Sequence, residues 1–156
     1  MAITYLTLEQ AIDVHRKTVE VSGGGALGHL DLGTLEGVLA HIQNDDYYPT
    51  LEEKLTHLFF SACKFHCFQD GNKRIAITLC TQMLLFNGYL YCAGRFIRDM
   101  ENISYHVAAG LIDKSLLGDL ICAAINDDMD DEDLKLRLLH ALATAVPDHN
   151  DLGDAP

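Results

Sequence analysis

Apolar residues recur at helical spacing along most of the chain. From about residue 8 to 21 they are separated by three or four positions, which places them on one face of a helix. The residues of that face are Leu8, Ala11, Ile12, His15 and Val19. Similar patterns predict helices from Asp31 onward, at about 102–113, at about 116–126 and at 134–145. The stretch 89–99 alternates irregularly, and we expect a short strand or an extended turn there.

Local sequence signals predict where several helices begin and end. Thr7 with Gln10 and Thr50 with Glu53 have the form of capping boxes, and Asp31 is a good N-cap residue. Asn87-Gly88 is a typical helix stop. A Gly run at 23–25 ends the first helix; it is a linker rather than a phosphate loop, because it lacks the Lys-Ser/Thr ending.

Two consecutive segments have contrasting patterns. The helix expected from 51 to about 66 has an apolar stripe and an opposite polar one, the latter made of Lys54, His57, Ser61 and Lys64. The helix expected from about 75 to 86 is apolar nearly all round, so it should be buried at the centre of a bundle.

Length and composition indicate one domain. The chain has 156 residues, of which 49% are hydrophobic, enough for a single core. We expect a domain over 1–146 and a flexible tail over 147–156, which is polar and rich in Gly and Asp. No apolar run is long enough to span a membrane and no signal peptide is evident, so a cytoplasmic location is expected. An odd number of cysteines, five, fits reduced thiols in that compartment.

Charge narrows the range of partners. The net charge is −12, which argues against a nucleic-acid substrate. Basic residues gather instead at Lys64, Lys73 and Arg74. The acidic run at 127–133 precedes a predicted helix and fits a helix start better than a calcium loop, because a glycine-bent loop and a distal Glu are missing.

Residues 66–74, with the sequence HCFQDGNKR, hold the candidate chemistry. A Gly turn that opens a helix exposes backbone N–H groups which bind phosphate, and the cations after Asn72 add donors. Asp70 can ligate a Mg²⁺ already held by phosphates. His66 can take a proton near neutral pH. Together they suit transfer of a phosphorus group from a Mg-nucleotide to a hydroxyl.

Each residue also has a simpler interpretation when it is taken alone. His66 could serve the helix dipole, Asp70 could be an N-cap, and Phe68 could be core. Gly71 could be a plain turn residue, and Lys73 with Arg74 a solvated first turn. A zinc site at Cys63, His66 and Cys67 lacks a second pair of ligands. Their joint occurrence in this order favours the functional interpretation.

The motif resembles the H-x-F-x-[D/E]-[G/A]-N-[G/K]-R signature of the Fic/Doc family, over about residues 5–126. The resemblance implies an all-α bundle of about six to seven helices. It implies His66 as general base, Asp70 as the Mg²⁺ ligand and Phe68 as a packing residue. The predicted nucleotide-phosphate site is Gly71, Asn72, Lys73 and Arg74.

The lysine at position 73 makes the motif similar to that of the death-on-curing (Doc) branch. AMP-transferring members usually have Gly at this position and a second Arg at the position of Ile77. The resemblance therefore implies a toxin kinase that transfers the terminal phosphate of ATP to a Ser or Thr hydroxyl of a target such as elongation factor Tu. Gly71 and Ile75 depart from the Doc pattern. The alternatives are a protein AMP or nucleotidyl transferase and a catalytically inactive binding module.

The resemblance also suggests how the protein binds its partners. Family members hold the target with a flap beside the active-site loop, often a short β-hairpin, which we place near Tyr47 and Tyr48. The inhibitory motif [S/T]-x-x-x-E-[G/N] is missing, because Leu32 and Ile97 precede the two candidate glutamates. We therefore expect a separate antitoxin that blocks the site in trans.

Overall fold

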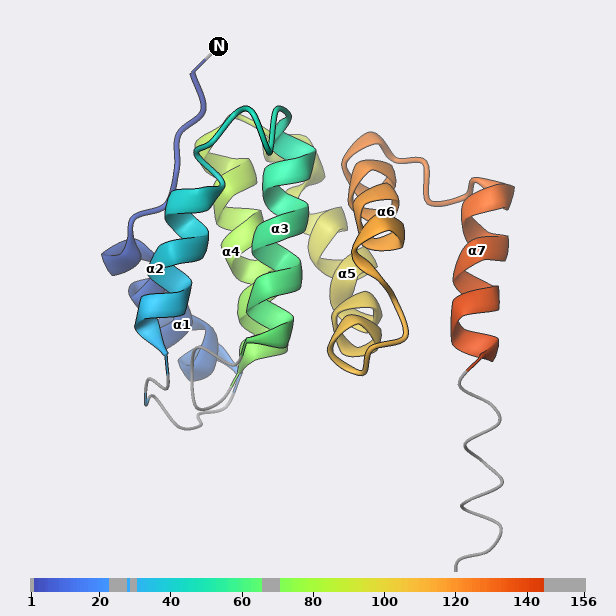
Figure 1. Ribbon diagram of the computed structural model, residues 1–156, viewed down its shortest axis with the longest axis horizontal. Helices are drawn as coiled ribbons and strands as arrows, with labels where there is room; N and C mark the ends of the chain where they lie inside the picture. The colour runs from blue at the N-terminus through green and yellow to red at the C-terminus, as the bar shows by residue number, and fades with distance from the viewer. Residues whose placement is uncertain (1, 23–27, 29–30, 66–70, 145–156) are drawn as a thin grey trace, which may run out of the picture.

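The computed structural model describes residues 2–22, 28, 31–65 and 71–144. Within these ranges it contains seven α-helices, one short 3₁₀ helix and no strand (Figure 1). The expected all-helical bundle is therefore confirmed. The helices are α1 (Leu8–Val21), α2 (Leu32–His41), α3 (Leu51–Lys64), α4 (Asn72–Phe86), α5 (Ala93–Ala108), α6 (Lys114–Asn126) and α7 (Glu132–Ala143), with η1 at Leu90–Cys92.

Side-chain caps begin the helices at the positions that the sequence predicts. The Thr7 hydroxyl accepts a hydrogen bond from the Gln10 N–H at 3.1 Å, and the Gln10 side chain accepts one from the Thr7 N–H at 2.9 Å, which completes a capping box. Asp31 caps α2 through the Thr34 N–H, and Thr50 caps α3 through the Glu53 N–H. Each cap satisfies a backbone donor that the helix itself cannot.

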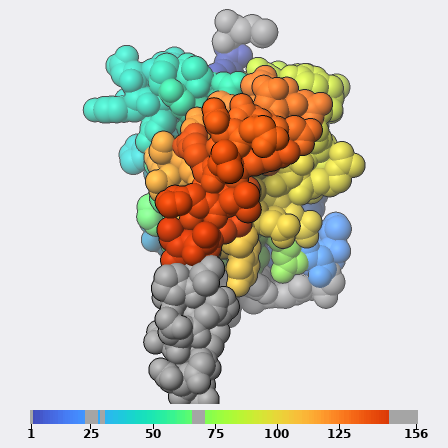
Figure 2. Space-filling view, turned by 90° about the vertical axis from the view of Figure 1, so that its right-hand side faces the viewer, coloured from blue at the N-terminus to red at the C-terminus, as the bar shows by residue number. Residues whose placement is uncertain are grey.

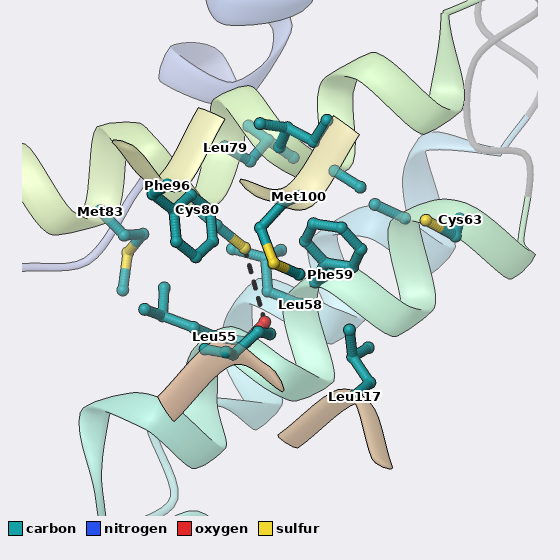
Figure 3. Packing of buried hydrophobic residues seen from close by; sticks show 14 of the residues in the cluster. Leu55, Leu58, Phe59, Cys63, Leu79, Cys80, Met83, Phe96, Met100 and Leu117 are labelled. Atoms are coloured by element: carbon teal, nitrogen blue, oxygen red, sulfur yellow. Dashed lines mark hydrogen bonds between the residues drawn. The ribbon is translucent and has the colours of Figure 1, made fainter. Parts of the chain in front are cut away.

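Helices α3 and α4 form the centre of the bundle, and α5 and α6 pack against them (Figure 3). Leu58 and Phe59 of α3 are fully buried, as are Leu79 and Met83 of α4. The Cys80 thiol donates to the Leu55 carbonyl at 3.4 Å, so it serves as a core residue. The prediction that α4 is the central helix is confirmed.

The predicted polar stripe of α3 is not a solvated face. Lys54 and Ser61 are buried. The Lys54 ammonium donates to the Ile42 carbonyl at 2.8 Å and forms an ion pair with Asp45 at 2.7 Å. Burial acts to lower the pKa of Lys54, but Asp45 and Tyr5 outweigh it, so that the pKa lies above its ordinary value. Lys54 thus ties the loop after α2 to the core.

Two other expectations are wrong in detail. No strand or extended turn forms at 89–99, because η1 leads directly into α5 at Ala93, well before the predicted start near 102. Segment 43–50 forms successive turns rather than a β-hairpin.

Arg95 on α5 donates hydrogen bonds to the Ala124 and Ile125 carbonyls, each at 3.2 Å, so it stabilises the end of α6.

The predicted tail 147–156 lies outside the described residues. None of the helices in the described ranges is both long and apolar enough to cross a membrane.

Candidate functional site

The first turn of α4 has the geometry of an anion site. Gly71 precedes the helix with φ 80° and ψ 13°, a left-handed conformation that glycine adopts at little cost. Its carbonyl accepts the first helical bond, from the Ile75 N–H at 2.8 Å. Gly71 has no side chain to cap the helix, and the N–H groups of a first helical turn have no partner within the helix. The positive end of the helix dipole adds to their attraction for an anion.

The surrounding helices hold this turn in place. Asn72 is buried, and the next three positions on the inner side of α4, Ile75, Ala76 and Leu79, are almost completely so. Against Gly71 lies α1: an added Cβ atom would lie 3.5 Å from Val19. Since the turn is attached to the most buried helix of the bundle, its backbone is preorganised for a ligand.

Two cations stand in the same turn. Lys73 and Arg74 are both exposed, and the Lys73 ammonium lies 5.3 Å from the centre of the Tyr105 ring of α5. Lys64 ends α3 nearby and lies over Phe60 at 5.7 Å. The three charges make a positive spot on a protein of net charge −12, which would steer a phosphate toward this end of the bundle.

Cys63 is a structural residue at the edge of this site. Burial raises the pKa of its thiol to about 12, although the positive charges of Lys64 and Lys73 act to lower it. Its Sγ lies 3.7 Å from the Ser104 carbonyl. In the described part of the chain, no group of His, Cys, Asp or Glu has the arrangement of a metal site. The raised pKa keeps the Cys63 thiol protonated at neutral pH, so it is a poor nucleophile. His66 and Cys67, the other members of the zinc cluster considered above, lie outside the described residues.

A cavity of ≈ 400 Å³ opens directly beside Arg74. It lies between α1, the beginning of α4 and the middle of α5. Its lining combines three charged residues, Lys17, Arg74 and Glu101, with apolar and hydroxyl-bearing ones: Thr18, Val21, Ser22, Ile77, Thr78 and Ile97. A group attached to a phosphate at Gly71 could extend into this space.

The structure brings together Gly71, Asn72, Lys73 and Arg74, the four described members of the predicted phosphate site. His66, Phe68 and Asp70 lie outside the described residues. Tyr47 and Tyr48 are not brought to this turn. They lie before the N-terminus of α3, whereas Gly71 follows its C-terminus (Figure 1), and a helix of 14 residues is roughly 20 Å long.

A second cluster of polar side chains, at the Tyr48 end of α3, was not foreseen. The Tyr48 ring stacks on His57 with centroids 4.7 Å apart, and the Lys114 ammonium lies 2.8 Å from His57 Nδ1. Burial, Lys114 and His41 lower the pKa of His57 to about 4, and burial lowers that of Lys114. No spacing in the sequence signals this contact, because the three residues come from separate elements.

Comparison with known proteins supports the motif. The model of the Fic/DOC family matches residues 5–84, just over half of the chain, and this range includes the whole stretch 66–74. No curated protein sequence matches the chain.

Proposed function

Because the chain belongs to the Fic/DOC family, we propose that it transfers a phosphorus-containing group from a Mg-nucleotide to a protein hydroxyl. The form we favour is a Doc-type kinase, which moves the terminal phosphate of ATP to a Ser or Thr side chain. Elongation factor Tu, the target that the family resemblance implies, is the first candidate substrate. In this proposal the protein is the toxin of a toxin–antitoxin pair.

The observation that carries the proposal is the left-handed Gly71 at the start of the buried helix α4, with two exposed cations, Lys73 and Arg74, in the first turn of that helix. Backbone N–H groups, the Lys73 point charge and the forked Arg74 guanidinium can together hold several phosphate oxygens. A turn that only connected two helices would have no need for this combination.

The proposed reaction assigns roles to five residues of the motif. His66 takes the proton of the target hydroxyl, whose oxygen then attacks the terminal phosphorus as the bond to the leaving ADP breaks. Gly71, Lys73 and Arg74 stabilise the negative charge that spreads over the phosphate oxygens. Asp70 would hold Mg²⁺, which neutralises phosphate charge. A single carboxylate suffices for a metal whose other ligands are phosphates and water, so the donors fit the ion.

Two positions on α4 favour transfer of the terminal phosphate. Lys73 stands where AMP-transferring relatives usually have Gly. Ile77, which is 6% exposed, stands where they have a second Arg, so this place on α4 offers no cation to a nucleotide. Nucleotidyl transfer is the second candidate, and the glycine at position 71 supports it, because the AMP-transferring branch prefers Gly there and the Doc branch Ala.

The residues that line the cavity beside Arg74 are consistent with inhibition of the site by a separate antitoxin rather than by the chain itself. Glu101 lines the same cavity as Arg74, but no ion pair joins these two described side chains. Ile97, one turn before Glu101, also lines the cavity and lacks the hydroxyl of the inhibitory motif. We therefore expect the chain alone to be toxic when active. Active protein purified at high yield from a healthy culture would contradict this.

The test is the intact mass of elongation factor Tu after incubation with the protein and Mg-ATP. A gain of one phosphate supports the kinase, a gain of one AMP supports the nucleotidyl transferase, and an unchanged mass contradicts both for this target. His66→Ala should abolish the gain, because the base is lost. His41→Ala is the matched control; it removes an exposed histidine at the end of α2 and should leave the gain intact.

A further inference from the structure

Helix α7 has apolar residues on two opposite faces. Its inner face packs on the core through the buried Leu134 and the partly buried Leu138 and Ala141. Its outer face carries Leu136 and Leu139, which are 61% and 63% exposed. The helix lies at the edge of the bundle beside α6 (Figure 1), and it forms the front of the surface in Figure 2.

The outer residues follow the spacing of a helix-pairing seam. Glu132, Leu136, Leu139 and Ala143 are separated by steps of four, three and four, which is the alternation of a heptad repeat. With about 100° of rotation per residue, these positions point away from Leu134 and Leu138. A helix that is apolar on both sides is normally covered on both sides.

We propose that a second copy of this chain covers this outer seam, with the two α7 helices packed antiparallel about a twofold axis. In such a pair Leu136 of one copy packs on the partner's Leu139, and the reverse contact repeats across the axis. This self-complementarity is what a twofold interface requires.

An acceptor and a donor beside the seam favour this partner and this orientation. Asp133 and His140 lie seven residues apart on one flank of the seam. Antiparallel pairing sets Asp133 against the partner's His140, and symmetry makes this contact twice. Parallel pairing would instead set Lys135 beside the partner's His140, and the lysine offers the imidazole N–H no acceptor. A surface that complements itself points to a second copy rather than to another protein.

A hollow on the same flank widens the contact. A cavity of ≈ 590 Å³ lies between the beginning of α6 and α7, lined in part by Leu111, Leu116, Leu136 and His140. Side chains of the second helix can enter it and add buried apolar area. The seam lies on α7, which packs mainly on α6, so the pairing leaves the first turn of α4 accessible.

Sedimentation equilibrium of the full chain tests the proposal. We expect a concentration-dependent dimer and a monomer for the double variant Leu136→Glu/Leu139→Glu. The matched control is Leu90→Glu, which replaces a leucine of η1 that is 71% exposed and should remain dimeric. Circular dichroism checks that each variant keeps its helices. A monomeric unaltered chain, or a dimer that survives the double change, would overturn the proposal.

Charge reversal tests the orientation separately. His140→Glu alone sets two carboxylates against each other in the antiparallel pair, and Asp133→Lys alone replaces the acceptor that faces the partner's imidazole by a second donor. Each should weaken the dimer about threefold to tenfold. Both changes in one chain restore opposite charges and should recover most of the affinity. A double variant weaker than either single one would contradict the antiparallel arrangement.

Discussion

Gly71, at the start of α4, faces the buried His15 of α1: an added Cβ atom would lie 3.8 Å from the imidazole Nε2. That is an ordinary contact distance, so space does not exclude a methyl group. The backbone conformation does penalise it, because φ is 80° and a left-handed conformation costs an L-residue about 1–2 kcal/mol.

Gly71→Ala should therefore lower the free energy of unfolding by about 1 kcal/mol, as measured by urea denaturation. The matched control is Gly37→Ala, inside α2, where an added Cβ meets nothing within 4 Å. It should leave stability unchanged or raise it by about 0.5–1 kcal/mol. Equal losses in the two variants would show that Gly71 is not held in the left-handed conformation.

Lys54→Met tests the buried ammonium that holds the loop after α2. The change leaves the Ile42 carbonyl without its donor, whereas the Asp45 side chain, 78% exposed, can return to water. We expect a loss of about 2 kcal/mol in the free energy of unfolding. Arg16→Met, which removes an exposed pair with Asp13 on α1, should cost less than about 1 kcal/mol. If Lys54→Met lowered the free energy of unfolding by no more than Arg16→Met does, the loop after α2 would not depend on the Lys54 ammonium.

His57 should make stability fall in mild acid. Burial and the charges of Lys114 and His41 lower its pKa from 6.5 to about 4. The unfolded chain therefore binds a proton near pH 6.5 that the folded chain binds only near pH 4, so stability is lost as the pH falls through this window. The full shift corresponds to about 3 kcal/mol, and solvent screening of the partly exposed ring reduces it to about 1–2 kcal/mol.

His57→Phe keeps a ring that can stack on Tyr48 but cannot take a proton. Urea denaturation at several pH values should show a smaller decline between pH 6.5 and pH 4 for this variant. The same slope in both proteins would assign the pH dependence to other groups.

Local signals in the sequence were sufficient for much of the fold. A cap involves residues three positions apart, so Thr7, Asp31 and Thr50 could be recognised directly. The start of α5 was missed because Cys92 precedes it and supplies no side-chain cap. The burial of Lys54 could not be predicted, since its partners Ile42 and Asp45 are on another segment.

In the candidate site too, features formed by neighbouring residues could be predicted, whereas contacts between distant segments could not. The cations of the first turn of α4 and the glycine before it are contiguous in the chain, so the motif could be found by inspection. The cavity beside Arg74 is assembled from α1, α4 and α5, and its existence depends on how these helices pack. The contact between His57 and Lys114 joins residues 57 positions apart, beyond the reach of any local pattern.

The central claim is that nucleotide phosphates bind at the first turn of α4, and calorimetric titration of the protein with Mg-ATP tests it most directly. Arg74→Gln removes a charged forked donor and should weaken binding about tenfold or more. Arg98→Gln removes an exposed arginine of α5 outside the cavity lining and should bind as the unaltered chain does. Equal affinity in all three proteins, or no binding by the unaltered chain, would contradict the account.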